Sequence, residues 1–440
     1  MTTALGGASP RIRRGQRTAL CLITLAGMLN FIDRSALAVA NPLIRHDLGL
    51  SVGQMGLLLS AFLWAYALCQ LPSGLLVDQW GPRRLLGGSI LVWSAIQALG
   101  GLASGLWGFI GARIALGLAE APLFPGMVRI VRDWYAPHER GLPSGIGFSA
   151  NKIGPALAPL LLTPLMLTCG WRWTFALTGA AGAMLALIWY RFYREPGGLR
   201  LTADETAYLS GGEDEPDSRR ATLADWCELL RHRTTRGMVL GMFGEVYMGW
   251  LYQTWLPAYL EIERHMSIPK TGWVAGIPFA FGVAGAIGSG WLADRLSALG
   301  LSPVNSCRLS IVSGMVAMAG FTVVAALTPS TMVAVAAISV ALLFNGVSGA
   351  MVCTLASVVA PHRCAGSLHG IQNCGGFVGG SLAPVVTGFI VQGGGGFAPA
   401  LLFSACLGLV CALSYVFLVQ DRPMEAAAFA RVPGENVARV

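Results

Sequence analysis

Four charged residues lie inside two of the most apolar stretches of the chain. Asp33 and Arg34 are adjacent in LNFIDRSALAVA, residues 29–40, while Arg113 and Glu120 stand seven residues apart in GARIALGLAEAPLFPG, residues 111–126. Arginine offers a permanently charged fork that matches a carboxylate through two hydrogen bonds. A buried carboxyl group binds or releases a proton according to its surroundings. These residue types can therefore hold an organic anion and carry a proton.

Helical geometry decides which of these groups can act together. Adjacent residues on a helix point about 100° apart, so Asp33 and Arg34 cannot simply neutralise each other and each is expected to serve a different neighbour. Arg113 and Glu120 face the same way, about 10 Å apart along the axis. That separation disfavours direct pairing, and both are expected to meet groups on other helices. Two interpretations stay open: charges that only hold helices together, or a pathway for substrate and protons.

The composition is that of a polytopic membrane protein. Hydrophobic residues make up 54% of the 440 residues and charged residues only 12%, against about 25% charged in soluble domains. A charge at the bilayer centre costs roughly 3 kcal/mol, so the four charges above need a reason to be there. Apolar runs of about 20 residues, the length that spans a bilayer, predict twelve transmembrane helices. Their centres are expected near residues 29, 66, 95, 118, 154, 183, 248, 283, 317, 342, 378 and 408.

Basic residues predict the orientation of the chain. A cluster precedes the first span, so the positive-inside rule places the amino terminus, and after twelve spans the carboxyl terminus, in the cytoplasm. Only four basic residues then lie outside, namely Arg45, Arg172, Arg264 and Lys270. The net charge of +8 therefore reflects topology, with the lipid bilayer as partner. No nucleic-acid partner is expected.

One long polar interval divides the chain into two halves of six spans. It contains the acidic stretch GGEDEPDSRR, residues 211–220, which is interpreted as part of a cytoplasmic linker rather than a regulatory module. A partial echo supports the division, because GLLVDQWGPRR from Gly74 recurs as GWLADRL from Gly290. The expected fold class is all-α, with twelve transmembrane helices in two pseudo-symmetric six-helix bundles. The expected segments are a tail at 1–17, a bundle at 18–193, a linker at 194–235, a bundle at 236–419 and a tail at 420–440.

The echoed sequence predicts a conformational latch at a cytoplasmic turn. Gly74 or Gly290 would let two helices approach closely, while Asp78 or Asp294 can meet nearby arginines and helix ends. Ordinary anchoring by loop charges is the alternative. The predicted latch residues are Gly74, Asp78, Arg83, Arg84, Asp294 and Arg295.

Cysteines and the first apolar segment exclude other interpretations. The ten cysteines show no CxxC spacing, so neither a disulfide framework nor a metal site is predicted. The first apolar segment is too long for the core of a cleaved signal and is expected to remain as a span.

Several motifs together resemble the anion:cation symporter family of the major facilitator superfamily. They are the Gly-x-x-x-Asp-x-x-Gly-x-Arg-Arg turn with its partial copy, Asn30-Phe-Ile-Asp33-Arg34, Phe62-Leu-Trp-Ala-Tyr66 to Gln70, Arg113 to Glu120 with Pro125-Gly126, and Gly370-Ile-Gln-Asn373. Bacterial transporters of galactonate and other sugar acids belong to this family, as do animal vesicular glutamate and sialic-acid carriers. The resemblance covers roughly residues 18–420. It implies that Asp33 and Glu120 carry coupling protons, and that Arg34, Tyr66 and Asn373 contact the substrate.

Further polar residues in the predicted spans complete the candidate substrate site. Neutral amide and phenol groups suit the hydroxyls of a polyol acid, because each can donate and accept a hydrogen bond. Lys152 departs from the small or polar residue that the resemblance implies at its place. It can bind a second anionic group of the substrate, or it can pair with Glu120 or Glu245, and pairing is slightly favoured. The substrate-binding candidates are Arg34, Tyr66, Gln70, Arg113, Asn151, Lys152, Tyr252, Gln372 and Asn373.

These observations predict a proton-coupled symporter that imports an organic carboxylate, preferably a sugar acid, by alternating access. The coupling ion is H⁺, no other cofactor is expected, and the resemblance implies a monomer. An efflux antiporter on the same scaffold is the alternative, although pockets for cationic drugs are usually acidic and aromatic, whereas arginine and lysine dominate here. A membrane enzyme is disfavoured, because no nucleophile–base pair, His-rich metal cluster or nucleotide motif is evident in the sequence.

Overall fold

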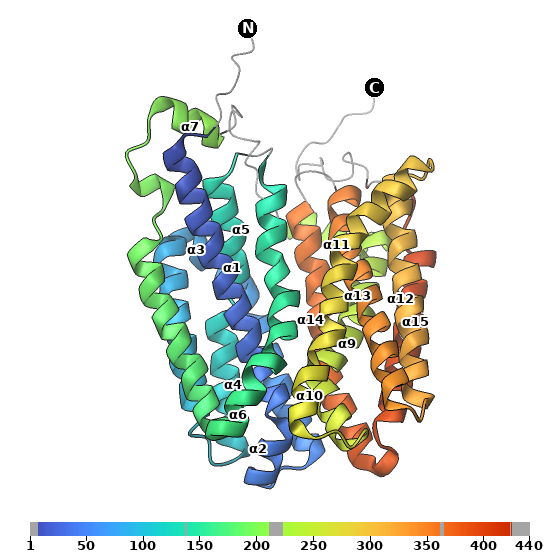
Figure 1. Ribbon diagram of the computed structural model, residues 1–440. Helices are drawn as coiled ribbons and strands as arrows, with labels where there is room; N and C mark the ends of the chain where they lie inside the picture. The colour runs from blue at the N-terminus through green and yellow to red at the C-terminus, as the bar shows by residue number, and fades with distance from the viewer. Residues whose placement is uncertain (1–7, 137–138, 211–222, 361–364, 423, 425–440) are drawn as a thin grey trace. The chain divides into compact units, whose positions relative to one another are not determined.

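The computed structural model describes residues 8–136, 139–210, 223–360, 365–422 and 424 (Figure 1). In this part of the chain every regular element is a helix and no strand is present. The predicted all-α fold class is therefore confirmed. The acidic stretch 211–220 and most of the predicted carboxyl-terminal tail lie outside the described residues.

The first half of the chain forms long helices joined by short turns. Its elements are α1 (Pro10–Val39), α2 (Asn41–Leu48), α3 (Val52–Gly100), α4 (Leu106–Glu120), α5 (Leu123–Trp134), α6 (Gly141–Phe192), the 3₁₀ turn η2 (Pro196–Gly198) and α7 (Ala203–Ser210). The Ser9 side chain caps α1 by accepting the N–H of Ile12, and Ser51 with Gln54 forms a capping box at α3. Such caps satisfy backbone N–H groups that the start of a helix leaves unpaired.

The second half repeats this construction. Its elements are α8 (Leu223–Arg231), α9 (Arg233–Ile262), α10 (Ile268–Val274), α11 (Gly276–Ala298), α12 (Pro303–Leu327), α13 (Thr331–Val359), α14 (Ala365–Ile390), the π-helical turn η4 (Val391–Gly395) and α15 (Phe397–Phe417). Ser302 and Ser330 cap α12 and α13 through their side chains. A serine that replaces the missing helical hydrogen bond thus fixes where each of these two helices begins.

Two glycines interrupt the longest helices. The backbone is non-helical at Gly81 in α3, with φ of 75°, and at Gly170 in α6, with φ of 79°. Glycine adopts a positive φ without the steric penalty that a Cβ brings, so the chain turns sharply at both positions. α3 has 49 residues and α6 has 52. At about 1.5 Å per residue, each is long enough to cross a bilayer core of about 30 Å twice.

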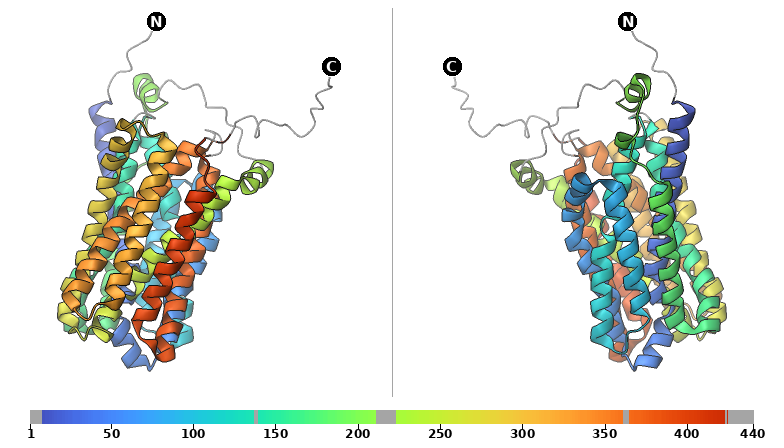
Figure 2. Two further views of the ribbon diagram at one scale, coloured as in Figure 1. Left: turned by 90° about the vertical axis from the view of Figure 1, so that its right-hand side faces the viewer. Right: turned by 90° about the vertical axis from the view of Figure 1, so that its left-hand side faces the viewer.

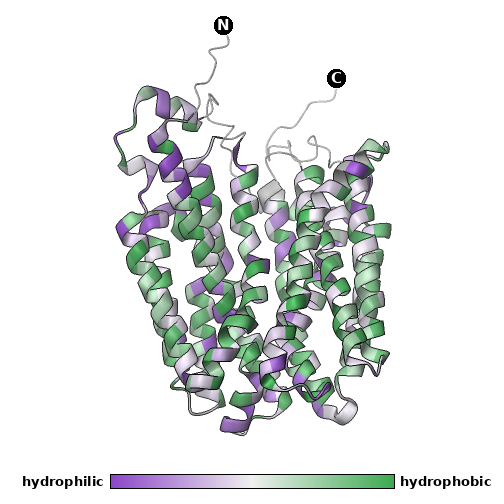
Figure 3. Ribbon diagram, in the orientation of Figure 1, coloured by the Kyte–Doolittle hydropathy of each residue, from purple (hydrophilic) through white to green (hydrophobic). Residues whose placement is uncertain are grey.

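Nine helices in the described part of the chain are long and apolar enough to cross a membrane. Figure 3 shows hydrophobic residues along their length, and hydrophilic residues concentrated near α7 and near α2. The protein is therefore a multi-pass membrane protein. The count of twelve spans stays a prediction, and the breaks at Gly81 and Gly170 mark where one long helix would supply two of them.

Contacts group the chain into two compact units. Unit 1 comprises Met1–Pro216, Trp250–Val283 and Ser381–Ala400, and unit 2 comprises Asp217–Gly249, Ala284–Gly380 and Leu401–Val440. Segments of α9, α11 and α14 therefore belong to unit 1 together with the helices of the first half. The predicted boundaries of the two bundles follow the sequence rather than these contacts, and they stay a prediction.

Hydrogen bonds explain why second-half segments belong to unit 1. The Ser60 hydroxyl on α3 donates to the carbonyl oxygen of Ser381 on α14 at 2.5 Å, and the Trp255 indole on α9 donates to the carbonyl oxygen of Pro384 at 3.1 Å. A Cβ added at Gly56 would lie 2.6 Å from the same Pro384 oxygen. Close backbone approach at a small residue is the usual way that membrane helices pack. The start of α3 is thus bound to parts of α9 and α14.

Within the first half, α1 packs against α6, and α3 packs against α4 and α6. Glycines make room for these contacts. A Cβ at Gly117 of α4 would lie 2.4 Å from the backbone oxygen of Phe62 on α3, and one at Gly154 of α6 would lie 2.5 Å from the Cβ of Phe31 on α1. Both contacts surround the buried charges of α1 and α4.

Replacing Gly117 by alanine is expected to lower the melting temperature of the purified protein. The new methyl group would collide with the backbone of α3, which cannot move aside as a flexible side chain can, and overpacking of this kind costs roughly 1–3 kcal/mol. Gly111 is a matched control on the same helix, because a Cβ there meets none of the described residues within 4 Å. Thermal unfolding in detergent should separate the two variants, and an equal effect at both positions would contradict the close approach of α3 and α4.

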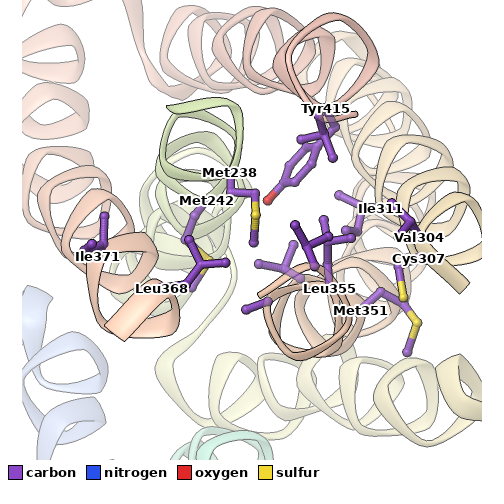
Figure 4. Packing of buried hydrophobic residues seen from close by; sticks show 14 of the residues in the cluster. Met238, Met242, Val304, Cys307, Ile311, Met351, Leu355, Leu368, Ile371 and Tyr415 are labelled. Carbon is purple, nitrogen blue, oxygen red and sulfur yellow. The ribbon is translucent and has the colours of Figure 1, made fainter. Parts of the chain in front are cut away.

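Unit 2 has an apolar core built from its own helices (Figure 4). Side chains of α9, α12, α13, α14 and α15 meet there, and Leu229 of α8 is fully buried in the same cluster. The labelled core residues are Met238, Met242, Val304, Cys307, Ile311, Met351, Leu355, Leu368, Ile371 and Tyr415. α8, which falls in the predicted linker, therefore belongs to the folded core of unit 2.

Candidate functional site

The α1 helix buries both members of the adjacent charged pair. Asp33 is fully buried and Arg34 is 6% exposed, and Asn30, one turn earlier, is also fully buried. Burial on this scale excludes a role for the pair in binding headgroups at the membrane surface. The charges face the interior of unit 1, where an ionised group needs a partner.

The α4 helix presents Arg113 and Glu120 on its buried side and ends at Glu120. Both residues are buried, so the prediction that they share a face is confirmed. The end of the helix has a local cause: Pro122 lacks an N–H and would clash with the preceding turn of a continuous helix. A carboxylate at a helix C-terminus faces the negative end of the helix dipole. Glu120 therefore depends on a cation from elsewhere.

The cation that compensates the Glu120 carboxylate is Arg34. Its Nε atom lies 2.8 Å from Oε2 of Glu120, and both side chains are almost completely buried. The pair joins α1 to the end of α4, so each charge meets a group on another helix, as expected. A buried pair of this kind is costly to break, because the remaining charge is left without compensation.

Aromatic rings surround the Arg34 guanidinium. Its Cζ atom lies 4.8 Å from the ring centre of Phe31, 4.7 Å from that of Phe62 and 4.4 Å from that of Tyr66. Arg113 lies 5.0 Å from the ring centre of Phe62, on α3. Ring faces attract a cation electrostatically. The rings therefore stabilise both guanidinium groups.

Several polar atoms of this cluster are buried without a hydrogen-bond partner among the described residues. They are Nη2 of Arg34, Nε and Nη1 of Arg113, Oε1 of Glu120, both carboxyl oxygens of Asp33 and both amide atoms of Asn30. An unsatisfied buried polar group costs free energy, so such a concentration is unusual in a purely structural site. Donors from two arginines beside two carboxyl groups are the chemistry that an anion and a proton would use.

The remaining candidates of unit 1 lie on neighbouring helices. Gln70 on α3 is half-buried with its Oε1 atom unsatisfied, Asn151 and Lys152 on α6 are half-buried, and Tyr252 on α9 is 2% exposed. Arg34 is the cation that pairs with Glu120, and the choice for Lys152 between pairing with Glu120 or Glu245 and binding a second anionic group stays a prediction. Gly154, two residues after Lys152, packs closely on Phe31, which places this part of α6 beside the α1 segment that carries Asp33.

Unit 2 contains the two candidates of α14. Gln372 is 1% exposed and donates to the carbonyl oxygen of Val352 at 3.4 Å, while Asn373 contacts His369 one turn earlier at 3.1 Å. Unit 2 also holds a buried pair in which Asn345 donates to Glu245 at 2.7 Å. Among the residues described in unit 2, these contacts thus involve the amide groups of Gln372, Asn373 and Asn345 and the carboxyl group of Glu245.

The predicted latch residues are arranged differently from the expectation. Asp78 pairs with Arg129 of α5 at 2.7 Å and lies 3.9 Å from Arg132, instead of meeting Arg83, Arg84 or Arg295. The reason is the break at Gly81, which turns the chain so that Arg83 donates to the carbonyl oxygen of Tyr190 on α6. The ion pair of Asp78 and Arg129 thus joins the end of the first α3 segment to α5. The side chain of Asp294 lies outside the described residues, and Arg295 is exposed.

The two echoed glycines make no close helix contact in the described part of the chain. Among the described residues, a Cβ added at Gly74 or at Gly290 meets nothing within 4 Å, so their packing role stays a prediction. Close approach occurs instead at Gly117 and Gly154, beside the charged cluster. Spacing alone could not distinguish a glycine on an open helix face from one under a neighbouring backbone.

Sequence reasoning predicted Tyr66 but gave no role to Phe31, Phe62 or Asn30, which complete the site. Phe62 lies one turn before Tyr66 on α3, and Asn30 lies one turn before Arg34 on α1. Residues four apart share a helix face, so this spacing was the available signal. Among the described residues, no group of three or more His, Cys, Asp or Glu side chains is placed to hold a metal ion.

Long apolar helices around a buried, partly unsatisfied charged cluster are the features of a polytopic membrane transporter. The chain belongs to the major facilitator superfamily, whose family model matches residues 23–384. It is 40% identical over 413 residues to the probable L-galactonate transporter of Escherichia coli K12, covering 94% of this chain and 91% of the relative. It is 34% identical to the D-galactonate transporter of Escherichia coli O6:H1, covering 96% of this chain and 99% of the relative.

Solved structures agree with the fold. A bacterial homologue of the human lysosomal transporter Spinster matches with a TM-score of 0.77 and 19% identity, covering 94% of this chain and 99% of that one. A D-xylose–proton symporter matches with a TM-score of 0.70 and 13% identity, covering 92% and 98%. The resemblance seen in the sequence motifs is confirmed, and the chain is a transporter rather than an enzyme.

Proposed function

We propose that this protein is a proton-coupled symporter that imports an organic carboxylate, preferably a sugar acid such as an aldonate, aldarate or uronate. The observation that carries the proposal is the pair of buried guanidinium groups with unpartnered N–H donors beside two buried carboxyl groups. Relatives named as transporters of galactonate and of galactarate or glucarate support this substrate class.

A charge count links the anion to the proton. Arg34 and Glu120 neutralise each other, which leaves Arg113 and Asp33 as the other charged groups of the cluster. With a proton on Asp33 the cluster has one net positive charge, which the carboxylate of a substrate would cancel. With Asp33 ionised the cluster is already neutral, and an added anion would be uncompensated in a low-dielectric site. Proton binding and anion binding therefore favour each other.

A cluster without net charge also favours the conformational change of the transport cycle. A buried carboxyl group without hydrogen-bond partners is less costly when it is protonated, and the described surroundings of Asp33 match that form. The loaded, neutral cluster can then change its access from one side of the membrane to the other. Release of the proton to the cytoplasm would restore the charge of Asp33 and eject the anion. We place the protein in a bacterial inner membrane with both termini cytoplasmic, acting as a monomer.

The other polar candidates are proposed to bind the rest of the substrate. Tyr66, Gln70, Asn151 and Tyr252 in unit 1, and Gln372 and Asn373 in unit 2, offer the donors and acceptors that hydroxyl groups require. Lys152 is proposed to bind a second anionic group when the substrate is a dicarboxylate.

Ligand binding to the native state raises thermal stability, so a melting-temperature screen against organic anions tests this proposal. A panel of aldonates, aldarates, uronates and unrelated carboxylates should contain members that raise the melting temperature of the wild-type protein. The Lys152→Gln variant should lose the response to dicarboxylates far more than the response to monocarboxylates. No stabilisation by any member of the panel would count against an anion site, and equal losses for both classes would remove the special role of Lys152.

An efflux antiporter for drugs or other organic anions is the competing function. The cluster contains two arginines and only one carboxyl group that is free of an ion pair, so it favours anions over cationic drugs. Direction of transport decides between uptake and efflux of an anion, since an inward proton gradient drives substrate inward in a symporter and outward in an antiporter.

Asp78 and Arg129 are proposed as the conformational latch. We expect Asp78→Ala to change the maximal transport rate by about fivefold, because a partly exposed ion pair contributes at most about 1 kcal/mol, while the affinity for the anion stays the same. Asp78→Glu keeps the charge and should retain most of the rate. Initial uptake rates over a range of substrate concentrations give both quantities. A rate in Asp78→Ala equal to that of the wild type would show that the pair only anchors the turn.

A further inference from the structure

The first part of the predicted linker is folded onto the start of the chain. α7 lies beside the first turns of α1 in each view of unit 1 (Figures 1 and 2). Tyr208 is 6% exposed and Glu205 is 8% exposed, which is low for residues of a short helix outside the apolar spans. A connection that only tethered two halves would have no need to bury these side chains.

Glu205 joins the beginnings of two helices. One carboxylate oxygen accepts the backbone N–H of Thr202 at 3.0 Å, and the N–H of Glu205 donates to the Thr202 hydroxyl at 3.3 Å, which together form a capping box for α7. The other oxygen accepts the Ser9 hydroxyl at 2.6 Å. Ser9 is itself the N-cap of α1, since its oxygen accepts the N–H of Ile12 at 3.2 Å.

Tyr208 connects α7 to α1 and to Glu139, which lies between the end of α5 and the start of α6. Its hydroxyl donates to Glu139 at 2.6 Å and accepts from Gln16 of α1 at 3.2 Å. The Gln16 amide also donates to the carbonyl oxygen of Trp134, the last residue of α5, at 2.8 Å. Glu139 in turn accepts two hydrogen bonds from Arg13, at 2.8 and 3.0 Å. One tyrosine hydroxyl therefore joins a hydrogen-bonded network across three segments, in which the contacts of the Gln16 amide are buried.

These segments lead to the charged cluster. α1 continues from Gln16 to Arg34, about 27 Å further along the helix at 1.5 Å per residue. α5 begins at Leu123, directly after the turn that follows Glu120. The network at the end of α5 and the ion pair at the end of α4 are thus two separate ties between the same pair of chain segments. A rotation or slide of α1 at one tie must displace it at the other.

On the basis of the proposed transport function, we propose that α7 is a clasp that fixes the first turns of α1 to the end of α5 and so sets the position of Arg34 against Glu120. Tyr208 and Glu205 are positioning residues in this arrangement and do not touch the substrate. The clasp stays closed throughout the transport cycle, so α7 moves with the helices of the first half.

The chemistry of the clasp suits a permanent contact. The Ser9 hydroxyl and the Thr202 amide lower the pKa of Glu205, with a smaller effect from Arg11, so its carboxylate is ionised at neutral pH. Because the pKa of Glu205 is lowered, the stability that its ionised carboxylate contributes is fully present above the ordinary pKa of 4.5. That stability is lost only as the pH falls through the lowered pKa. Burial and the neighbouring Glu139 raise the pKa of Tyr208, so its hydroxyl keeps its proton at neutral pH despite the opposing effect of Arg13. The clasp should therefore be unchanged between about pH 6 and pH 8.

The first test removes one oxygen atom. Tyr208→Phe keeps the buried ring and deletes both hydroxyl contacts. Amide hydrogen exchange at the beginning of α1 should become at least about tenfold faster, which corresponds to a loss of about 1.4 kcal/mol of local stability, and the affinity for an anion that stabilises the wild type should fall severalfold. Tyr190→Phe is the matched control, because the Tyr190 hydroxyl on α6 donates to the carbonyl oxygen of Arg84 on α3. Unchanged exchange in Tyr208→Phe would overturn the proposal.

The second test restores the clasp covalently. Ser9→Cys and Glu205→Cys, joined by a short thiol-specific crosslinker, tie α7 to α1. In the Tyr208→Phe background the crosslink should return exchange and affinity to wild-type values, which a general loss of stability would not allow. In an otherwise unchanged protein it should leave transport intact, and arrest of transport would refute a clasp that stays closed. The exchange measurement needs no substrate, so it remains decisive even if the proposed transport function is wrong.

Discussion

Replacing Arg34 by alanine is expected to abolish measurable binding of the substrate anion. Arg34 has one N–H group committed to Glu120 and Nη2 available, in a site where three aromatic rings exclude water from the guanidinium. A hydrogen bond to a charged group contributes about 1.5–3 kcal/mol, and the positive charge lost with it balances the anion. We therefore expect an affinity loss of at least about 100-fold, measured by ligand-induced thermal stabilisation or by calorimetry.

The same substitution should destabilise the protein, and a second variant separates the two effects. Arg34→Ala leaves Glu120 buried without its cation, which costs about 3–5 kcal/mol. Adding Glu120→Gln removes the uncompensated charge, so the double variant should recover much of the lost thermal stability without recovering anion binding. Arg172→Ala is a control, because Arg172 pairs with Asp47 away from the site. Normal anion affinity in the double variant would show that Arg34 is structural only.

Removing the titratable group of Asp33 is expected to abolish proton-driven accumulation. Asp33→Asn keeps the size and polarity of the side chain, and Asp33 forms no hydrogen bond in the described structure that the change would break. For one coupled proton, a gradient of one pH unit provides 1.36 kcal/mol, or about tenfold accumulation. In Asp33→Asn this ratio should fall to about one, while exchange of labelled for unlabelled substrate across the membrane continues.

Glu120→Gln should give the same loss of accumulation with an additional effect on affinity, because the cluster then carries one net positive charge even when Asp33 is ionised and the anion no longer needs a proton to bind. The neutral amide that replaces the carboxylate can no longer balance the charge of Arg34, so the position of the guanidinium is less well fixed. Glu228→Gln, at an exposed site on α8, serves as control for removal of a carboxylate. Continued accumulation in Asp33→Asn would move the proton-carrying role to another residue, and continued accumulation in both variants would refute this coupling scheme.

The buried charges were the most predictable part of the site. An ionisable residue inside an apolar span must have a polar neighbour, so the sequence alone indicated that Asp33, Arg34, Arg113 and Glu120 would face the interior. It also indicated that Arg34 and Glu120 would each meet another helix. It did not indicate that they would meet each other, because the pairing depends on how α1 crosses the end of α4.

Two local features of the sequence predict the surroundings of Arg34. Pro122, two residues after Glu120, signals the end of α4, and it makes Glu120 a helix C-terminal residue rather than one in mid-helix. The four-residue spacing of Phe62 and Tyr66 places two rings on one face of α3. Neither feature required tertiary information, yet both shape the environment of Arg34.

Other features depend on how the helices are directed and packed in the folded protein. The break at Gly81 decides that Asp78 meets Arg129 of α5 while Arg83 turns toward α6. Whether a glycine lies under a neighbouring backbone likewise depends on the packing of two helices, which is why Gly117 makes a close contact and Gly74 does not. The docking of α7 belongs to the same class, since its partners Ser9 and Gln16 lie nearly two hundred residues away in the chain, 196 in the case of Ser9 and Glu205.

The most direct test of proton-coupled symport is uptake by proteoliposomes that contain the purified protein, under an imposed inward proton gradient. Aldonates, aldarates, uronates and other carboxylates are supplied outside, and internal substrate and internal pH are measured together. We predict that at least one sugar acid accumulates and that the lumen acidifies in step with its uptake. Uptake of none of these acids, or accumulation without acidification, would contradict the proposed symport.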